Sequence, residues 1–332
     1  MPNRDIARAM RCLVAALCIA CEGADITQLS TQPPQPLQPE EEPLRPAPSP
    51  QVVKIEGRIA FESTRDGEPW IYVTTSESLS VRRLTKGQRP AISWDGERVA
   101  FENWQAGSPS TLHVINSDGT NERVIGPGQS PAWSPDGKQI VFARYGTPGG
   151  GLYVVSPDGG VPVRLLSDEF EARDHWVLSP AWSPDGRRIA FTHGGTTDWY
   201  SYADPVGIYL VNADGSQARS LTGIPAYWEE EAAWSPDGSR LLFVSGGASW
   251  SLVSTNAAGD SARVHGTGFG PDWSPDGQLI SYYRHTIPPG PEHRMRIFVT
   301  TKDGKELQLI PDAVSAHHPY SDLNASWSRK RK

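Results

Sequence analysis

A block of about a dozen residues recurs along this chain, and it constrains the fold more than any other feature. Five copies are clear: PAISWDGERVAF from Pro90, PAWSPDGKQIVF from Pro131, PAWSPDGRRIAF from Pro180, AAWSPDGSRLLF from Ala232 and PDWSPDGQLISY from Pro271. A partial sixth copy is divided between EGRIAF at Glu56 and ASWSRKRK at Ala325. Such a repeat indicates one supersecondary unit used several times.

Each unit reads as a set of short β-strands. Runs such as KQIVFARY, LYVVSPDG and VPVRLLS alternate apolar with polar side chains and contain β-branched and aromatic residues, a pattern typical of strands. The Asp-Gly pairs between the runs are tight-turn residues. We therefore predict four strands per unit. The composition agrees, because 32 Gly, 30 Pro and 12 Trp describe a turn-rich, aromatic-rich chain.

The spacing of the turn glycines predicts how the units are arranged. Successive spacings are 39, 41, 49, 52 and 39 residues, which is the size of a propeller blade, for Gly57, Gly96, Gly137, Gly186, Gly238 and Gly277. The segment ASWS at residues 325–328 supplies the first strand that the unit beginning at Arg58 lacks. The fold class predicted is all-β, a six-bladed β-propeller closed by pairing of the C-terminal strand with the N-terminal blade, which removes an exposed sheet edge.

Recurrence also separates structural residues from functional ones. A large apolar side chain contributes roughly 1.5–3 kcal/mol when fully buried, so an aromatic residue repeated at one place in each unit indicates packing between units. We assign this structural role to Trp133, Trp182, Trp234, Trp273 and Trp327. The repeated turn aspartates, such as Asp136 and Asp185, are expected to be structural for the same reason.

The quoted repeats, PAWSPDG with IVF, LYVVSPDGG and VRLLS, and AAWSPDG with LLF, resemble those of the TolB-like family of six-bladed propellers. Related propellers occur in some oligopeptidases and in oligogalacturonate lyases. The resemblance covers residues 55–332 and implies the fold, whereas function depends on the site. TolB itself has an additional α/β domain before its propeller, and residues 22–52 are too short and proline-rich to form one, so we do not expect this chain to be TolB.

The N-terminal residues predict export. Residues 1–21 combine a basic start with the short apolar run CLVAALCIA at residues 12–20, as in a signal peptide. Ala20 directly precedes Cys21, which resembles the lipobox of bacterial lipoproteins, so we predict lipidation of Cys21. Cleavage without lipidation, or retention of the segment as an anchor, are the alternatives. All three cysteines, Cys12, Cys18 and Cys21, belong to this segment.

Three parts of the chain are therefore expected: the signal peptide at 1–21, a proline-rich disordered tether at 22–52, and the propeller at 53–332. The tether has too little apolar surface to fold. The predicted location is extracytoplasmic, with the protein anchored by lipid to a bacterial membrane at the periplasm or the cell surface. The net charge of −7 argues against nucleic acid as a partner.

A propeller places its connections on two faces. The turns between first and second and between third and fourth strands are short and share one face, here called the plain face. The second-to-third loops and the junctions between blades share the other, the loop face, which varies in length. Variable loops on a rigid scaffold usually carry binding, so the candidate ligand-binding residues are those of the loop face: Trp176, Trp199, Tyr200, Trp228, Trp250, His175, Glu229 and Tyr320.

Exposed aromatic residues are typical anchors of protein interfaces, so we predict a protein-binding module whose partner is an envelope or cell-surface protein. A carbohydrate-binding propeller is an alternative, in which aromatic rings stack on polysaccharide. A metal-dependent polysaccharide lyase-like enzyme is another, with His317, His318 and Asp322 as candidate metal ligands. No catalytic residue is assigned, no GxSxG motif is present, and no cofactor is predicted beyond this candidate divalent metal.

Overall fold

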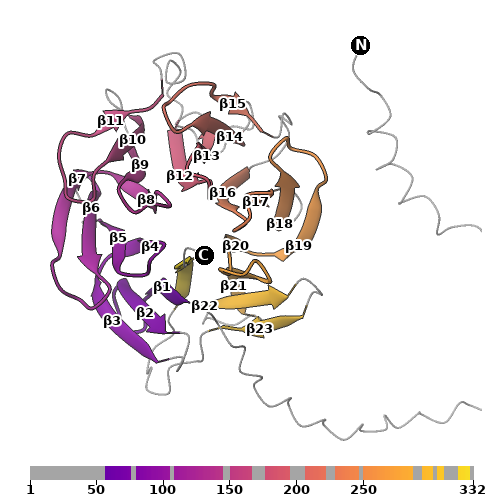
Figure 1. The fold of residues 1–332 in the computed structure, drawn as a ribbon. Helices are drawn as coiled ribbons and strands as arrows, with labels where there is room; N and C mark the ends of the chain where they lie inside the picture. Colours follow the sequence, from indigo (N-terminus) through magenta and orange to yellow (C-terminus); the bar gives the residue numbers. More distant parts are fainter. Residues whose placement is uncertain are drawn as a thin grey trace, which may run out of the picture. The chain divides into compact units, whose positions relative to one another are not determined.

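In the computed structural model, the described residues belong to the compact unit Val52–Lys332. The structure describes residues 57–75, 80–104, 108–144, 150–166, 176–194, 206–221, 229–246, 250–286, 294–301, 305–309 and 321–329. Within these ranges the strands form six four-stranded antiparallel sheets arranged as a ring (Figure 1). The prediction of an all-β six-bladed propeller is confirmed. No helix in these ranges is long and apolar enough to cross a membrane.

Blade 1 combines the two ends of the propeller. Its order is β24-β1-β2-β3, and the bounds are β24 Asp322–Trp327, β1 Arg58–Ser63, β2 Trp70–Thr75 and β3 Val81–Lys86. Strand β24 pairs antiparallel with β1, with Ile59 opposite Trp327 and Ser63 opposite Asp322. The predicted closure by the C-terminal strand is therefore confirmed.

The other blades each use four consecutive strands. Blade 2 contains β4 Gln88–Ile92, β5 Arg98–Asn103, β6 Thr111–Asn116 and β7 Arg123–Pro127. Blade 3 contains β8 Gln129–Trp133, β9 Ile140–Arg144, β10 Gly151–Val155 and β11 Val163–Arg164. Blade 4 contains β12 Trp176–Trp182, β13 Arg188–Gly194, β14 Gly207–Asn212 and β15 Arg219–Ser220.

Blade 5 contains β16 Glu229–Trp234, β17 Arg240–Ser245, β18 Ser251–Asn256 and β19 Arg263–Thr267. Blade 6 contains β20 Phe269–Trp273, β21 Leu279–Thr286, β22 Arg294–Thr301 and β23 Glu306–Gln308. The first strand of each blade lies at the centre of the ring and the fourth lies at its outer edge (Figure 1).

The repeated serine and aspartate form the turn between first and second strands. In blade 3 the Ser134 hydroxyl donates to Asp136 at 2.7 Å, and Asp136 accepts from the amide of Lys138 at 3.1 Å. Gly137 follows with a φ of 70°, which glycine adopts without steric cost. The same bonds recur at Asp185, Asp237 and Asp276, so these aspartates hold turns of the plain face.

The repeated tryptophans lie between neighbouring blades. Their exposed fractions are 1–8%, for Trp133, Trp182, Trp234, Trp273 and Trp327. The Trp133 indole N–H donates to the Ala91 carbonyl of the preceding blade at 2.9 Å, and Trp234 bonds Ala181 in the same way at 3.2 Å. All five rings are buried, and those of Trp133 and Trp234 also join two sheets by a hydrogen bond, so the core of the molecule is a circle of interfaces between blades.

Candidate functional site

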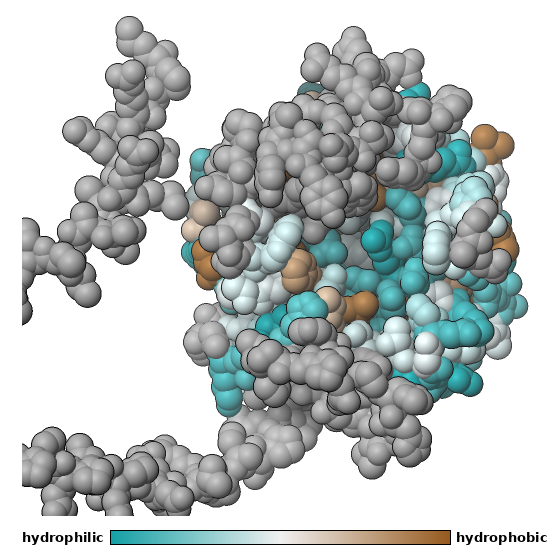
Figure 2. Space-filling view, turned by 180° about the vertical axis from the view of Figure 1, so that it is seen from behind, coloured by the Kyte–Doolittle hydropathy of each residue, from teal (hydrophilic) through white to brown (hydrophobic). Residues whose placement is uncertain are grey.

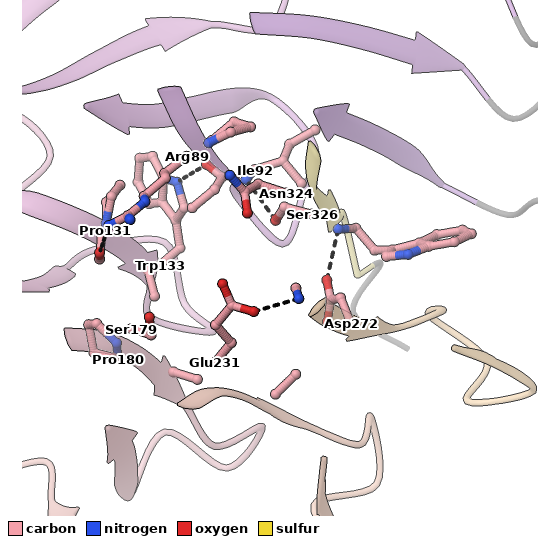
Figure 3. Close-up of a pocket in the computed structure, with 18 of the residues that line it drawn as sticks. Arg89, Ile92, Pro131, Trp133, Ser179, Pro180, Glu231, Asp272, Asn324 and Ser326 are labelled. Atoms are coloured by element: carbon pink, nitrogen blue, oxygen red, sulfur yellow. Dashed lines mark hydrogen bonds between the residues drawn. The ribbon is translucent and has the colours of Figure 1, made fainter. Parts of the chain in front are cut away.

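The inner strands surround a central pocket with a volume of about 210 Å³ (Figure 3). Prolines and alanines near the start of these strands, such as Pro131 and Ala132, form part of its wall. Seen from behind the view of Figure 1, the surface is hollowed near the centre of the ring, and hydrophilic side chains lie in the hollow (Figure 2). The axis of the propeller is thus an open polar site.

A backbone irregularity recurs in all six inner strands. Each strand contains a residue with positive φ between 47° and 57°, and all six line the pocket: Arg89, Ser130, Ser179, Glu231, Gly270 and Asn324. In every blade the pairing register with the second strand shifts at this point, which is the mark of a β-bulge. Five of the six are not glycine, although the left-handed region is uncommon for other residues. We call these six residues the bulge ring.

Carboxylates satisfy the amides that the bulges free from sheet pairing. Glu62 accepts from the amide of Arg89 at 3.1 Å, and Glu231 accepts from the amide of Gly270 at 2.5 Å. Glu102 accepts from the amide of Ser130. A buried N–H without a partner is costly, so these acids stabilise the bulges across neighbouring blades.

Arg89 lies between two buried acids on the side of blades 1 to 3. Its Nε is 3.3 Å from Glu102 and its Nη1 donates to the Ser130 hydroxyl at 3.2 Å. Glu62 and Glu102 are each 5% exposed, and burial raises the pKa of both carboxyls. Asn324 donates to Glu62 at 3.1 Å. The Arg89 side chain is itself 49% exposed, so part of its guanidinium group can donate hydrogen bonds to a ligand in the channel.

A second polar group lies where the C-terminal residues meet blade 6. Asp272 accepts from the amide of Trp327 at 3.0 Å and from Arg329 at 2.9 Å. The Arg329 guanidinium also lies over the ring of Trp94, 5.1 Å from its centroid. Trp94 and Arg329 line the pocket, and they follow the inner strands on the side of the plain face. Arg329 therefore narrows that end of the channel.

Trp104 and Trp250 are exposed tryptophans of the loop face. Trp104 follows β5 and is 58% exposed, and Trp250 precedes β18 and is 39% exposed. The Trp250 ring contacts Phe269 at 5.4 Å between centroids, and Phe269 stacks on Tyr283 at 5.8 Å. Gly270 is glycine because a Cβ there would lie 2.5 Å from Tyr283. An aromatic strip thus runs from the rim to the bulge ring.

Residues 48–177 match a family model described as the TolB beta propeller domain, PD40. Over these residues the chain is similar to that domain, and its six four-stranded sheets form a propeller ring. TolB from Acinetobacter baumannii has 16% identity and a TM-score of 0.64, over 84% of this chain and 68% of that one.

Two further solved structures share the fold. Hydrazine synthase from Kuenenia stuttgartiensis has 15% identity and a TM-score of 0.59, over 82% of this chain and 46% of that one. A chain of the nidogen–laminin complex has 13% identity and a TM-score of 0.57, over 82% and 99%. No curated protein matches the chain.

Few of the predicted site residues lie among the residues that the structure describes. Trp250 lies on the loop face, as stated above. Trp176 begins β12 and Glu229 begins β16, so both lie where a blade junction enters an inner strand. The remaining candidates lie outside the described residues: Cys21, His175, Trp199, Tyr200, Trp228, His317, His318 and Tyr320.

Among the metal candidates, Asp322 is described. It is 0% exposed and its Oδ1 is 2.8 Å from Arg65, so one of its oxygens is engaged in a buried ion pair. The described residues contain no group of three or more His, Cys, Asp or Glu side chains that could hold a metal ion.

The sequence interpretation missed the bulge ring and Trp104. One signal was present: the position immediately before the repeat reads Arg, Ser, Ser, Glu, Gly and Asn in the six copies. Variation at one fixed place within a regular repeat indicates a position that the fold does not dictate. Trp104 follows the end of β5 in blade 2, beyond the repeated block, so the other copies offer no equivalent residue for comparison.

Proposed function

We propose that this TolB-like propeller is an exported, lipid-anchored binding module that holds an envelope or cell-surface protein on its loop face. The observation that carries the proposal is the exposure of Trp104 and Trp250 on that face. Exposed tryptophans are strong interface anchors because a partner removes a large apolar area from water. Rigid blades beneath them keep the entropy cost of binding low.

Export and anchoring rest on the N-terminal residues. A basic start, a short apolar run and Cys21 support processing as a lipoprotein. The tether would then let the propeller reach away from the membrane, because proline-rich chains are extended. Metabolic labelling with a radioactive fatty acid tests this: the native chain becomes labelled and fractionates with membranes, whereas the Cys21→Ser variant does neither. Equal labelling of both would contradict the anchor.

Capture of a partner tests the binding role. The chain carrying Cys21→Ser is crosslinked in envelope extract, and bound proteins are identified by mass spectrometry. The Trp104→Ala/Trp250→Ala variant is expected to lose at least about tenfold of the capture, since two anchors of 1–2 kcal/mol are removed. The control is Val124→Ala/Val264→Ala, which truncates exposed apolar residues of outer strands. Equal loss in both variants would contradict the loop face as the site.

A further inference from the structure

We propose that the central channel is a separate binding site for one uncharged sugar residue, presented by the end of a saccharide. The residues that would bind it are those of the bulge ring, above all Ser179, Glu231 and Asn324. This site does not depend on the protein-binding proposal, because Trp104 and Trp250 lie at the rim and the bulge ring lies in the channel.

The size of the pocket limits the ligand. Its volume is about 210 Å³, which is below the roughly 300–1,000 Å³ of pockets that enclose drug-sized ligands. One small group fits, such as a single sugar residue or one side chain. Arg329, over Trp94 and bonded to Asp272, narrows the plain-face end, so entry is from the loop face and the group that enters is the end of a chain.

The polar groups of the bulge ring fit hydroxyls. A guanidinium edge donates, a carboxylate accepts, and serine hydroxyls and the asparagine amide do both. The channel offers all of these at one level around its circumference, because each comes from the same position of an inner strand. Glu231 and Asn324 point toward the middle of the pocket (Figure 3). A sugar ring has hydroxyls around its own edge, each able to donate and accept, so it matches such a mixed ring.

The charges of the pocket argue against an anionic ligand. Arg89 is 3.3 Å from Glu102, and Asp272 is 2.9 Å from Arg329. Glu231 already accepts the Gly270 amide. An added carboxylate group would have to leave water for a site whose arginines already have carboxylate partners and in which Glu231 would repel it, which is unfavourable. Hydroxyls carry a much smaller desolvation cost.

The wall between the polar groups is apolar. Prolines follow the bulge in four inner strands, at Pro90, Pro131, Pro180 and Pro271, and all four line the pocket. These surfaces suit the C–H faces of a sugar ring, which are apolar while its edge is polar. The combination of few placed polar groups on an apolar wall is typical of small-molecule sites.

Binding is tested with methyl glycosides of glucose, galactose, mannose and N-acetylglucosamine on the full chain carrying Cys21→Ser. Saturation-transfer NMR identifies which probe binds, and calorimetry measures its dissociation constant, expected near about 1 mM for so small a ligand. The test variant is Ser179→Gly/Asn324→Gly. Glycine adopts the left-handed backbone that both positions require, so two polar groups are removed while the bulges are retained. Affinity is expected to fall at least about tenfold.

The matched control is Asn121→Gly, another residue of positive φ, at 56°, located before β7 and away from the channel. It should bind the probes as the native chain does. Absence of saturation transfer from every neutral glycoside at about 50 mM, where a millimolar site would be filled, overturns the proposal. So does equal binding by the test variant.

Two other probes exclude other ligand classes. If methyl galacturonate, the charged sugar, binds more tightly than methyl galactoside, the site recognises carboxylates and the proposal of an uncharged ligand is wrong. If the acetylated, amidated dipeptide Ala-Ser binds while no glycoside does, the channel takes a peptide instead. Protein capture through Trp104 and Trp250 is unaffected by any of these results, so the two proposals fail separately.

Discussion

Two kinds of junction connect the blades, and they differ in what holds the next inner strand. Three junctions are a single glycine: Gly87 before β4, Gly128 before β8 and Gly268 before β20. A Cβ on these residues would lie 2.4–2.6 Å from the aromatic ring of a second strand, Phe101, Phe142 or Tyr282. The other three inner strands, β12, β16 and β24, follow longer segments.

Strand β24 follows a longer segment, and ion pairs hold it in place of close packing at a glycine. Arg65 pairs with Asp322 at its start at 2.8 Å, and Asp272 holds Trp327 and Arg329 at its end. The residues of other inner strands that are equivalent to Asp272 are small, such as Ala132 in β8 and Ala233 in β16. The short junctions thus position a strand by close packing, whereas the closing strand is positioned by buried charge.

Removal of the buried carboxylate of Asp272 should have the largest effect. Asp272→Ala leaves Arg329 and the Trp327 amide without their acceptor, and both side chains of the ion pair are at most 16% exposed. Breaking a buried pair costs about 3 kcal/mol, and we expect this loss in the free energy of unfolding, measured with urea. Asp272→Asn, which keeps an acceptor for the amide, should lose less. Equal stability of Asp272→Ala and the native chain would contradict the role of the pair.

The next effect concerns packing at a short junction. Gly128→Ala places a methyl group 2.4 Å from Phe142, and overpacking of this kind costs about 2 kcal/mol. Adding Phe142→Leu to Gly128→Ala should cost less than the sum of the two single changes, because the smaller side chain relieves the clash. Additive losses in the double-mutant cycle would show that the cost of Gly128→Ala does not come from contact with the Phe142 ring.

A long junction should tolerate replacement. Substituting residues 222–228 by glycine and serine at the same length is expected to change the unfolding free energy by less than about 0.5 kcal/mol, because loop closure depends on length. The replacement removes Trp228, so capture of the partner should fall if this residue contributes to the loop face. A large loss of stability would contradict this expectation and show that the segment, like the single-glycine junctions, is needed for the fold.

The smallest effect is a dependence on pH. Burial raises the pKa of Glu62 and Glu102, so the folded state holds protons that the unfolded state has lost. Stability should therefore decrease as pH rises from about 4.5 through the raised values. Glu62→Gln and Glu102→Gln are expected to flatten this part of a urea-denaturation series between pH 4 and 7. Glu97→Gln, at an exposed turn, is the control, and an unchanged slope in the first two variants would contradict the assignment.

The sequence predicts much of the architecture because the repeat carries it. Alternating side chains define the strands, the Asp-Gly turns define their connections, and the divided sixth copy defines the closure between β24 and β1. These features repeat because every blade meets the same packing problem. The five tryptophans of the repeat are buried for that reason.

The left-handed backbone of the bulge ring could not be predicted from the sequence, for a physical reason. A left-handed residue is usually found through glycine, but only Gly270 among the six is glycine. The conformation of Arg89 or Ser130 comes from the sheet register and from carboxylates of neighbouring strands, Glu62 and Glu102, that accept hydrogen bonds from the freed amides. Contacts between residues about 30 positions apart in the chain are not visible in a local pattern.

Pairing of β24 with β1 has a consequence for synthesis. The amide of Arg58 donates to the hydroxyl of Ser328, 270 residues away, so the edge of β1 stays open during synthesis until β24 has been made. An unpaired edge is prone to join other chains. A chain truncated before β24 would keep that edge of β1 unpaired, and we expect such a product to aggregate.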